Sequence, residues 1–230
     1  MEVKPVPTVF ITGANRGIGF ELARQYAADG WVVHGAARDL ATADDLKSLG
    51  AIVHKLDVAD REQIKEVGET VAGQPIDLLI NNAGMWIGDD EHFGRFTNTQ
   101  WMEQFQVHVM GTFAMCEAFV DNLAASERKL MVNISSGNGS FGWDRGPGDY
   151  PYDTSKAALN LITKGMAADL LDRGITVMAM TPGNVQTDMS GPNAMLTPLE
   201  SVTGMRQVIA SLDISKTGTF YRHNGEVAPW

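Results

Sequence analysis

The sequence predicts an α/β fold in which residues 1–230 form a single doubly wound domain, with a parallel sheet of about seven strands and helices on both faces. Three observations predict it. Short apolar runs rich in β-branched residues alternate with amphipathic helical patterns along the chain. A glycine-rich turn joins the first apolar run to the first helical pattern. Small or polar residues follow several later runs, at the edge where the ends of parallel strands meet.

The alternation of patterns gives the expected order of elements. Strands are expected at residues 8–12, 31–37, 51–58, 76–80, 130–134, 176–180 and 218–222. Helices are expected from residue 20 to a stop at 29–30, and then at 46–50, 61–71, 101–123, 152–173 and 198–212. Residues 85–97 are interpreted as a loop, and their acidic run at 89–92 as solvated rather than as a metal site.

Composition narrows the classes of function. The chain is 44% hydrophobic and 20% charged, as expected of a globular domain, and its formal net charge of −10 argues against a nucleic-acid partner. The single cysteine, Cys116, excludes an internal disulfide. The start of the chain lacks the features of a signal peptide, and no apolar run approaches the roughly 20 residues that span a bilayer. We therefore expect a cytoplasmic protein with no membrane partner and no metal.

The glycine-rich turn at residues 12–19 reads TGANRGIG and follows the first strand. Gly13 permits a tight turn, Gly17 lets backbone approach a pyrophosphate, and Gly19 lets the helix pack closely on the strand. The helix N-terminus then offers free N–H groups to phosphate. This layout is that of a Rossmann-type dinucleotide site, although the spacing is GxxxGxG rather than the more common GxGxxG.

The end of the second strand indicates which dinucleotide is bound. A site that selects NAD usually has a carboxylate there for the ribose hydroxyls, whereas an Arg accommodates a 2′-phosphate. Here the strand ends in Ala37 and is followed by Arg38 and Asp39, and Arg16 lies in the glycine turn. Two guanidinium groups on one phosphate would form a charge-assisted site, which favours NADPH. The alternative is that Arg38 and Asp39 are simply solvated neighbours.

Two later strand ends carry further candidates for cofactor binding. Asp57 lies at the end of the strand at residues 51–58, where a carboxylate can accept a hydrogen bond from an adenine amine, although it could equally be a turn residue. Residues 81–84 read NNAG and follow the strand at 76–80. Small residues at this point leave room for a cofactor, and the amide side chains can bond a ribose or neighbouring backbone.

The start of the helix at residues 152–173 carries the candidate acid/base pair. Tyr152 and Lys156 lie one helical turn apart on one face. A phenol ionises near pH ~10, and an ammonium beside it lowers its pKa, so the pair would form a general acid/base tuned toward neutral pH. Ser136 ends the strand at 130–134 and faces the same cleft. The alternative is an ordinary helix start with one Tyr and one exposed Lys.

Taken together, these strings resemble the classical short-chain dehydrogenase/reductase family. The matches are TGANRGIG, the Asp57 site, NNAG, the Ser136 strand end, YxxxK at Tyr152 and PGxxxT at Pro182, in the expected order. The resemblance implies that Ser136 orients the carbonyl of the substrate and that Tyr152 donates the proton. It also implies that Lys156 lowers the pKa of Tyr152 and holds the nicotinamide ribose.

The expected cofactor is NADP(H), favoured over NAD because of Arg38 and Arg16. The residues expected to bind it are Gly13, Asn15, Arg16, Gly17, Ile18, Gly19, Arg38, Asp57, Val58, Asn81, Ala83, Gly84, Tyr152, Lys156, Pro182, Gly183, Val185 and Thr187. The closing sequence GTFYRHNGEVAPW also resembles the short carbonyl-reductase branch that includes sniffer and C-factor proteins.

One position departs from the family pattern. The family has Asn within a VNVxGTF-like string and that Asn supports a water leading to the Lys, whereas this chain reads VHVMGTF and has His108. An imidazole can also bond a water and relay a proton, and its unperturbed pKa is ~6.5. His108 is therefore a candidate catalytic residue. The alternative is that it only packs against the helix and leaves the relay weakened.

The expected substrate is a small carbonyl compound, apolar or aryl in character, because aromatic and Met side chains surround its expected position. These side chains are Trp86, Phe141, Trp143, Tyr150, Met189 and Met195, and residues 187–198 are interpreted as the substrate loop. Two rival functions are an NAD-dependent alcohol dehydrogenase and a catalytically weak NADP(H)-binding sensor. A homodimer or homotetramer is expected through the long helices that contain Trp101 and Tyr152.

Overall fold

The computed structural model describes residues 5–87, 93–144, 146 and 148–230. Within them, seven strands form one parallel sheet in the order β3-β2-β1-β4-β5-β6-β7. The strands are β1 (Thr8–Ile11), β2 (Val32–Ala37), β3 (Ile52–Lys55), β4 (Leu78–Asn81), β5 (Leu130–Ile134), β6 (Thr176–Thr181) and β7 (Phe220–Arg222). The predicted doubly wound α/β fold is confirmed.

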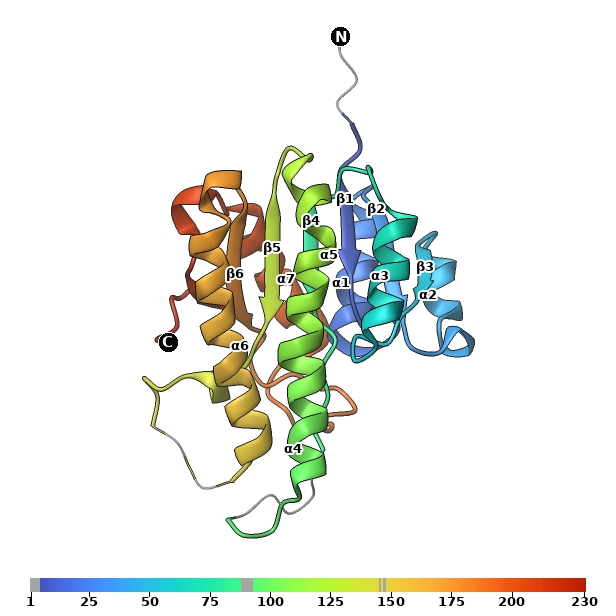
Figure 1. Ribbon diagram of the computed structural model, residues 1–230. Coiled ribbons are helices and arrows are strands. Elements are labelled where there is room, and N and C mark those ends of the chain that lie inside the picture. The colour runs from blue at the N-terminus through green and yellow to red at the C-terminus, as the bar shows by residue number, and fades with distance from the viewer. Residues whose placement is uncertain (1–4, 88–92, 145, 147) are drawn as a thin grey trace.

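Helices cover both faces of the sheet (Figure 1). They are α1 (Gly17–Ala28), α2 (Asp44–Ser48), α3 (Arg61–Thr70), α4 (Asn98–Phe105), α5 (Thr112–Ala124), α6 (Tyr150–Asp169) and α7 (Pro198–Ala210). One core cluster joins the sheet to α1, α2 and α7, and a second joins its other face to α3, α5 and α6. No described helix combines the length and apolar character needed to cross a membrane.

Strand alternation builds the two cores. In β1, Val9 and Ile11 pack into the cluster with α1 and α7, whereas Phe10 between them packs into the cluster with α3 and α5. Successive side chains of a strand point to opposite faces, so a strand covered on both faces must be apolar at nearly every position. This is why β1 is readable as a continuous apolar run.

Several element bounds differ from the predicted ones. The third strand ends at Lys55 instead of residue 58, because Asp57 makes a turn in which its carboxylate accepts from the Ala59 N–H at 2.9 Å. The helix predicted from residue 101 begins at Asn98, because Thr97 and Gln100 form a capping box. The helix predicted at 152–173 begins at Tyr150 and ends at Asp169.

A π-helical segment, Gln106–Gly111, joins α4 to α5. The sequence pattern predicts one continuous helix here. It does not predict the π-helical segment, because i→i+5 hydrogen bonding has no periodic signal of its own in the sequence. A Cβ on Gly111 would lie 2.3 Å from the carbonyl oxygen of Val58, so only glycine allows the segment to approach the loop after β3. The segment also carries His108 toward the carboxyl ends of the strands.

Candidate active site

A cleft of about 1230 Å³ opens at the carboxyl ends of the strands. Its lining comes from the glycine turn after β1, from the loops after β2 to β6, and from the start of α6. The strand order reverses direction between β1 and β4, and open α/β sheets bind ligands at this kind of switch point. The cleft exceeds the roughly 300–1,000 Å³ of a single small-molecule site, so it has room for a dinucleotide and a substrate.

The glycine turn forms a cradle at one end of the cleft. Gly13 and Gly17 have φ angles of 63° and 54°, in the left-handed region that favours glycine. A Cβ on Gly19 would lie 2.1 Å from the carbonyl oxygen of Gly13, which excludes any side chain there. Asn15, Arg16 and Ile18 of the same turn also line the cleft. The turn therefore leaves backbone N–H groups at the start of α1 accessible to an anion.

The loop after β4 is fixed to the glycine turn by Asn82, which the sequence analysis did not single out. Its backbone N–H donates to Thr12 Oγ1 at 2.9 Å, and its amide donates to the carbonyl oxygens of Thr12 and Gly13 at 3.0 and 3.1 Å. Ala83 and Gly84 follow and line the cleft as expected.

Asn81, an expected cofactor residue, lies outside the cleft lining. Strand alternation turns its side chain toward α5, where its amide donates to Asn133 Oδ1 at 2.8 Å and to Cys116 Sγ at 3.3 Å. It is buried, and its Oδ1 has no hydrogen-bond partner. The next residue of the motif, Asn82, is the one that lines the cleft.

Two arginines stand at the end of the cleft next to β2. Arg16 and Arg38 are exposed and line the cleft, and Arg16 forms an ion pair with Asp188 at 2.9 Å. The carboxylate of Asp39 accepts from the Ala41 N–H at 2.9 Å and caps the short helix Leu40–Thr42. Asp39 caps its own helix through one carboxylate oxygen and lines the cleft beside Arg38.

The remaining expected cofactor residues also meet in the cleft. Asp57 makes the turn and also lines the cleft, and its contact with a cofactor stays a prediction. A Cβ on Gly17 would lie 3.3 Å from Thr187 Cγ2, which shows how closely the loop after β6 approaches the glycine turn. The other lining residues from this group are Val58, Pro182, Gly183 and Val185.

Ser136, Tyr152 and Lys156 come together in the middle of the cleft. Lys156 Nζ donates to the carbonyl oxygen of Ile134 at 3.1 Å and lies 5.7 Å from the centre of the Tyr152 ring. Ser136 is hydrogen-bonded to the Tyr152 phenol through its side chain. Helix α6 is held against this strand end by Asn160, whose amide donates to the carbonyl oxygen of Gly139 at 3.0 Å.

Burial is the largest cause of the pKa shifts of Tyr152 and Lys156. It raises the pKa of Tyr152 to about 12, against a smaller lowering by the Ser136 hydrogen bond, and it lowers the pKa of Lys156 to about 7. The sequence analysis expected Lys156 to lower the pKa of Tyr152. In this geometry the ammonium is directed at the Ile134 carbonyl, and the phenol remains protonated throughout the neutral range.

His108 has both ring nitrogens bound to protein. Nε2 accepts from the Met85 N–H at 3.0 Å, and Nδ1 lies 2.8 Å from Ser155 Oγ. Because Ser155 donates its own proton to the carbonyl oxygen of Tyr152 at 2.6 Å, Nδ1 must be the donor, and the ring is neutral. Burial and the nearby Lys156 charge hold the pKa of His108 well below its usual value.

The sequence model of a known family matches residues 7–195, and its description is short chain dehydrogenase. This range includes the glycine turn and the Ser136, Tyr152 and Lys156 cluster.

The chain belongs to the short-chain dehydrogenase family.

Individual relatives of this short-chain dehydrogenase include a curated protein and two solved structures. C-signal of Myxococcus xanthus is 34% identical over 161 residues, which cover 68% of this chain and 93% of that protein. An NADPH-bound carbonyl reductase from chicken fatty liver is 30% identical with a TM-score of 0.86, covering 98% of this chain and 99% of the other. Carbonyl reductase Sniffer of D. melanogaster is 25% identical with a TM-score of 0.90, covering 98% and 100%.

The wall beyond Tyr152 in this short-chain dehydrogenase contains only part of the expected aromatic set. Trp86, Trp143 and Met189 line the cleft. Phe141, Tyr150 and Met195 do not, and Phe141 and Met195 are 86% and 81% exposed. The side chain of Trp143 packs over Gly137, where a Cβ would lie 2.7 Å from the ring. Trp143 therefore covers the residue that follows Ser136.

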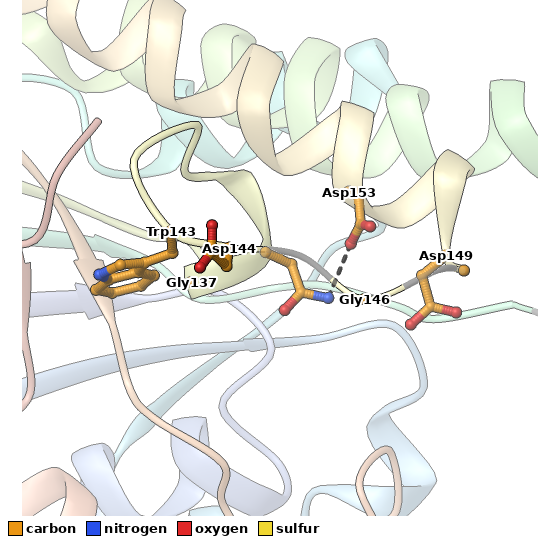
Figure 2. A pocket seen from close by; sticks show the side chains of 8 residues that line it. Gly137, Trp143, Asp144, Gly146, Asp149 and Asp153 are labelled. Carbon is orange, nitrogen blue, oxygen red and sulfur yellow. Dashed lines mark hydrogen bonds between the residues drawn. The ribbon is translucent and has the colours of Figure 1, made fainter.

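A smaller cavity of about 300 Å³ adjoins this wall (Figure 2). Trp143, Asp144, Asp149 and Asp153 line it, and Asn138 donates from its amide to Asp153 at 2.8 Å. Asp149 and Asn138 also line the main cleft, as does Arg222 from the end of β7. Asn138, Asp149 and Arg222 were not predicted as site residues, because no sequence motif marks them and only the fold brings them to the cleft.

The described residues contain no group of three or more His, Cys, Asp or Glu side chains that could hold a metal ion. The acidic run at residues 89–92, interpreted from the sequence as a solvated loop, lies outside the described part of the chain.

Proposed function

We propose that the protein is an NADPH-dependent carbonyl reductase that converts a ketone or aldehyde to an alcohol. The observation that carries the proposal is the convergence of Ser136, Tyr152 and Lys156 on one cleft with the glycine cradle. Membership of the short-chain dehydrogenase family, a family of oxidoreductases, and the carbonyl reductases among its relatives support it.

The proposed cofactor site fits a phosphorylated dinucleotide. The cradle of Gly13 and Gly17 has positive φ angles and no side chains, so backbone can approach a pyrophosphate. Arg38 is exposed at the end of β2, where the carboxylate of Asp39 caps a short helix through one oxygen. A guanidinium at this strand end accommodates a 2′-phosphate, which supports NADPH over NADH.

Bound NADPH would supply the hydride, and the residues of the chain would manage the negative charge that develops on the carbonyl oxygen. The Ser136 and Tyr152 hydroxyls would donate hydrogen bonds to that oxygen, and Tyr152 would transfer its proton to it. A pKa of about 12 keeps the phenol protonated at neutral pH, which is the state that reduction requires. Lys156 would hold the nicotinamide ribose and, with a pKa of about 7, return the proton to Tyr152.

The proposed substrate is an apolar or aryl carbonyl compound. Trp86, Trp143 and Met189 form an apolar wall on the side of the cleft where Ser136 and Tyr152 stand. Residues 187–198 form the proposed substrate loop, whose base is joined by the bridge between Val185 and Leu196. A cytoplasmic location stays the expectation from the sequence.

Reduction of a carbonyl panel tests the proposal. Purified protein is mixed with aryl ketones, diketones and quinones, and loss of nicotinamide absorbance is followed with NADPH and, separately, with NADH. We expect several aryl carbonyls to be reduced and NADPH to be preferred. A preference for NADH in the oxidative direction favours the NAD-dependent alcohol dehydrogenase. NADPH binding without turnover across the panel favours a sensor.

A further inference from the structure

Residues 226–230, called here the closing segment, run antiparallel to β7, and their last residues contact the loop that follows Ser136. The Ala228 N–H donates to the carbonyl oxygen of Phe220 at 2.8 Å, so the segment pairs with the edge of the sheet. Ala228 is buried, and the Trp230 ring stacks on Phe220 with 5.5 Å between the ring centres. The position of Trp230 is therefore determined by the sheet.

The closing segment is bonded to the loop that follows Ser136. The N–H groups of Phe141 and Gly142 both donate to the carbonyl oxygen of Trp230, at 3.0 and 3.2 Å. Ser140, whose side chain is buried, donates from its hydroxyl to the carbonyl oxygen of Pro229 at 2.7 Å. Three successive loop residues thus depend on two residues of the segment.

The contact is too close for a side chain at its centre. A Cβ on Gly142 would lie 2.4 Å from Pro229 Cβ, a separation that real Cβ atoms do not adopt. Any substitution of Gly142 must push the loop and the segment apart. Glycine at position 142 is therefore the residue type that lets Pro229 lie against the backbone of the loop.

The loop also connects the closing segment to the wall of the proposed substrate pocket. Trp143 follows Gly142 and is placed between Phe220, 6.4 Å away between ring centres, and Gly137. The Trp143 ring lines the cleft and covers Gly137, the residue next to Ser136. A continuous set of contacts therefore runs from Trp230 through the loop to the hydroxyl that faces the substrate.

We propose that the closing segment positions the substrate site, with Trp230 as its anchor. It holds the loop at residues 140–143 so that Trp143 forms the wall of the substrate pocket and Ser136 faces the carbonyl. This inference rests on the proposed reductase function, because it assigns the substrate to the Trp143 side of the cleft. Within the described part of the chain, no hydrogen bond or ring contact of the closing segment reaches the glycine turn, so the cofactor cradle is expected to be unaffected.

Kinetics of a Trp230→Ala variant test the role. With an aryl ketone that the unmodified protein reduces and with saturating NADPH, we expect KM to rise about tenfold, kcat to change less, and the NADPH Kd to stay within about twofold. Trp230→Phe keeps the stacking on Phe220 and should restore most of the affinity. Trp31→Ala is the matched control, because the Trp31 ring packs at a tilt against Tyr26, 4.8 Å between ring centres, and neither residue lines the cleft. It should lower the melting temperature without raising KM.

Amide exchange provides a readout that needs no turnover. In Trp230→Ala, and in Gly142→Ala as a second variant, the amides of Phe141 and Gly142 should exchange at least about tenfold faster than in the unmodified protein. Unchanged exchange in both variants overturns the proposal, and so does faster exchange with an unchanged KM. If the unmodified protein reduces no carbonyl compound, the reductase proposal fails, and the exchange data alone decide whether the segment holds the loop.

Discussion

His108 and Ser155 join the π-helical segment to the catalytic helix. Nδ1 of His108 lies 2.8 Å from Ser155 Oγ, and this hydroxyl donates in turn to the carbonyl oxygen of Tyr152. On its other side, His108 accepts from the Met85 N–H. A neutral imidazole with both nitrogens engaged has no free nitrogen for a water, and its low pKa means that it does not take up a proton near pH 7. This geometry supports the structural interpretation of His108 over the proton relay.

Substitution of His108 separates these two roles. His108→Ala leaves the Met85 N–H and the Ser155 hydroxyl without their partner, so we expect a loss of about 1–3 kcal/mol in the free energy of unfolding. The pH profile of kcat should keep its shape in the folded variant. His108→Asn, which retains one donor and one acceptor, should be more stable than His108→Ala. A folded His108→Ala protein whose kcat collapses only at neutral pH would instead support the relay.

Arg38 should determine the choice between the two nicotinamide cofactors. Removing a charge-assisted hydrogen bond to the 2′-phosphate in Arg38→Ala should raise the Kd for NADPH roughly 10- to 100-fold and leave the Kd for NADH nearly unchanged. Fluorescence titration measures both constants. Arg24→Ala is the matched control, because Arg24 pairs with Glu21 on α1 and lies outside the cleft lining. Equal weakening for both cofactors would place Arg38 away from the 2′-phosphate.

The low pKa of Lys156 should be visible in the pH dependence of stability. Between pH ~7 and ~10 the unfolded chain binds a proton at this lysine that the folded protein does not, so stability should rise with pH over that interval. Lys156→Met removes the difference. We therefore expect the free energy of unfolding to rise more steeply with pH in the unmodified protein than in Lys156→Met, by a few kcal/mol in total. Parallel curves in urea titrations would show that Lys156 stays charged when folded.

Exposed apolar side chains on neighbouring helices support the expected dimer or tetramer. Met102, Met110 and Phe113 belong to the α4–α5 helix, and Leu161, 73% exposed, belongs to α6 beside it (Figure 1). Light scattering should give at least twice the chain mass. Phe113→Glu combined with Leu161→Glu should give a monomer. Leu199→Glu on α7 is the control and should leave the mass unchanged, whereas a monomeric unmodified protein would refute the expectation.

Much of the fold is readable from the sequence because burial on both faces leaves a strong signal. Strands such as β5 and β6 are buried along their whole length, so each is a plain apolar run. The glycine turn is equally easy to recognise in the sequence. The φ angles at positions 13 and 17 and the close approach at position 19 all require glycine. Except for Asn81, the residues at the glycine-turn end of the cleft lining could therefore be predicted from the sequence, and their contacts with a cofactor stay predictions.

Two choices within the site could not be predicted in the same way. Asn81 and Asn82 have the same side chain, and only the register of β4 decides which one faces the cleft. Phe141 and Trp143 lie in an irregular loop without a period, and only contacts with Trp230, about 90 residues further along the chain, decide which one turns inward. These choices depend on tertiary contacts, and local sequence patterns carry no information about such contacts.

The central claim is that the Tyr152 phenol delivers the proton in a site that binds NADPH independently of it. The most direct measurement is kcat for carbonyl reduction by Tyr152→Phe, together with its Kd for NADPH. We predict that kcat falls by at least about 10²-fold while the Kd stays within about twofold of the unmodified value. A Tyr152→Phe protein that reduces the same carbonyl compound at the normal rate would contradict the mechanism.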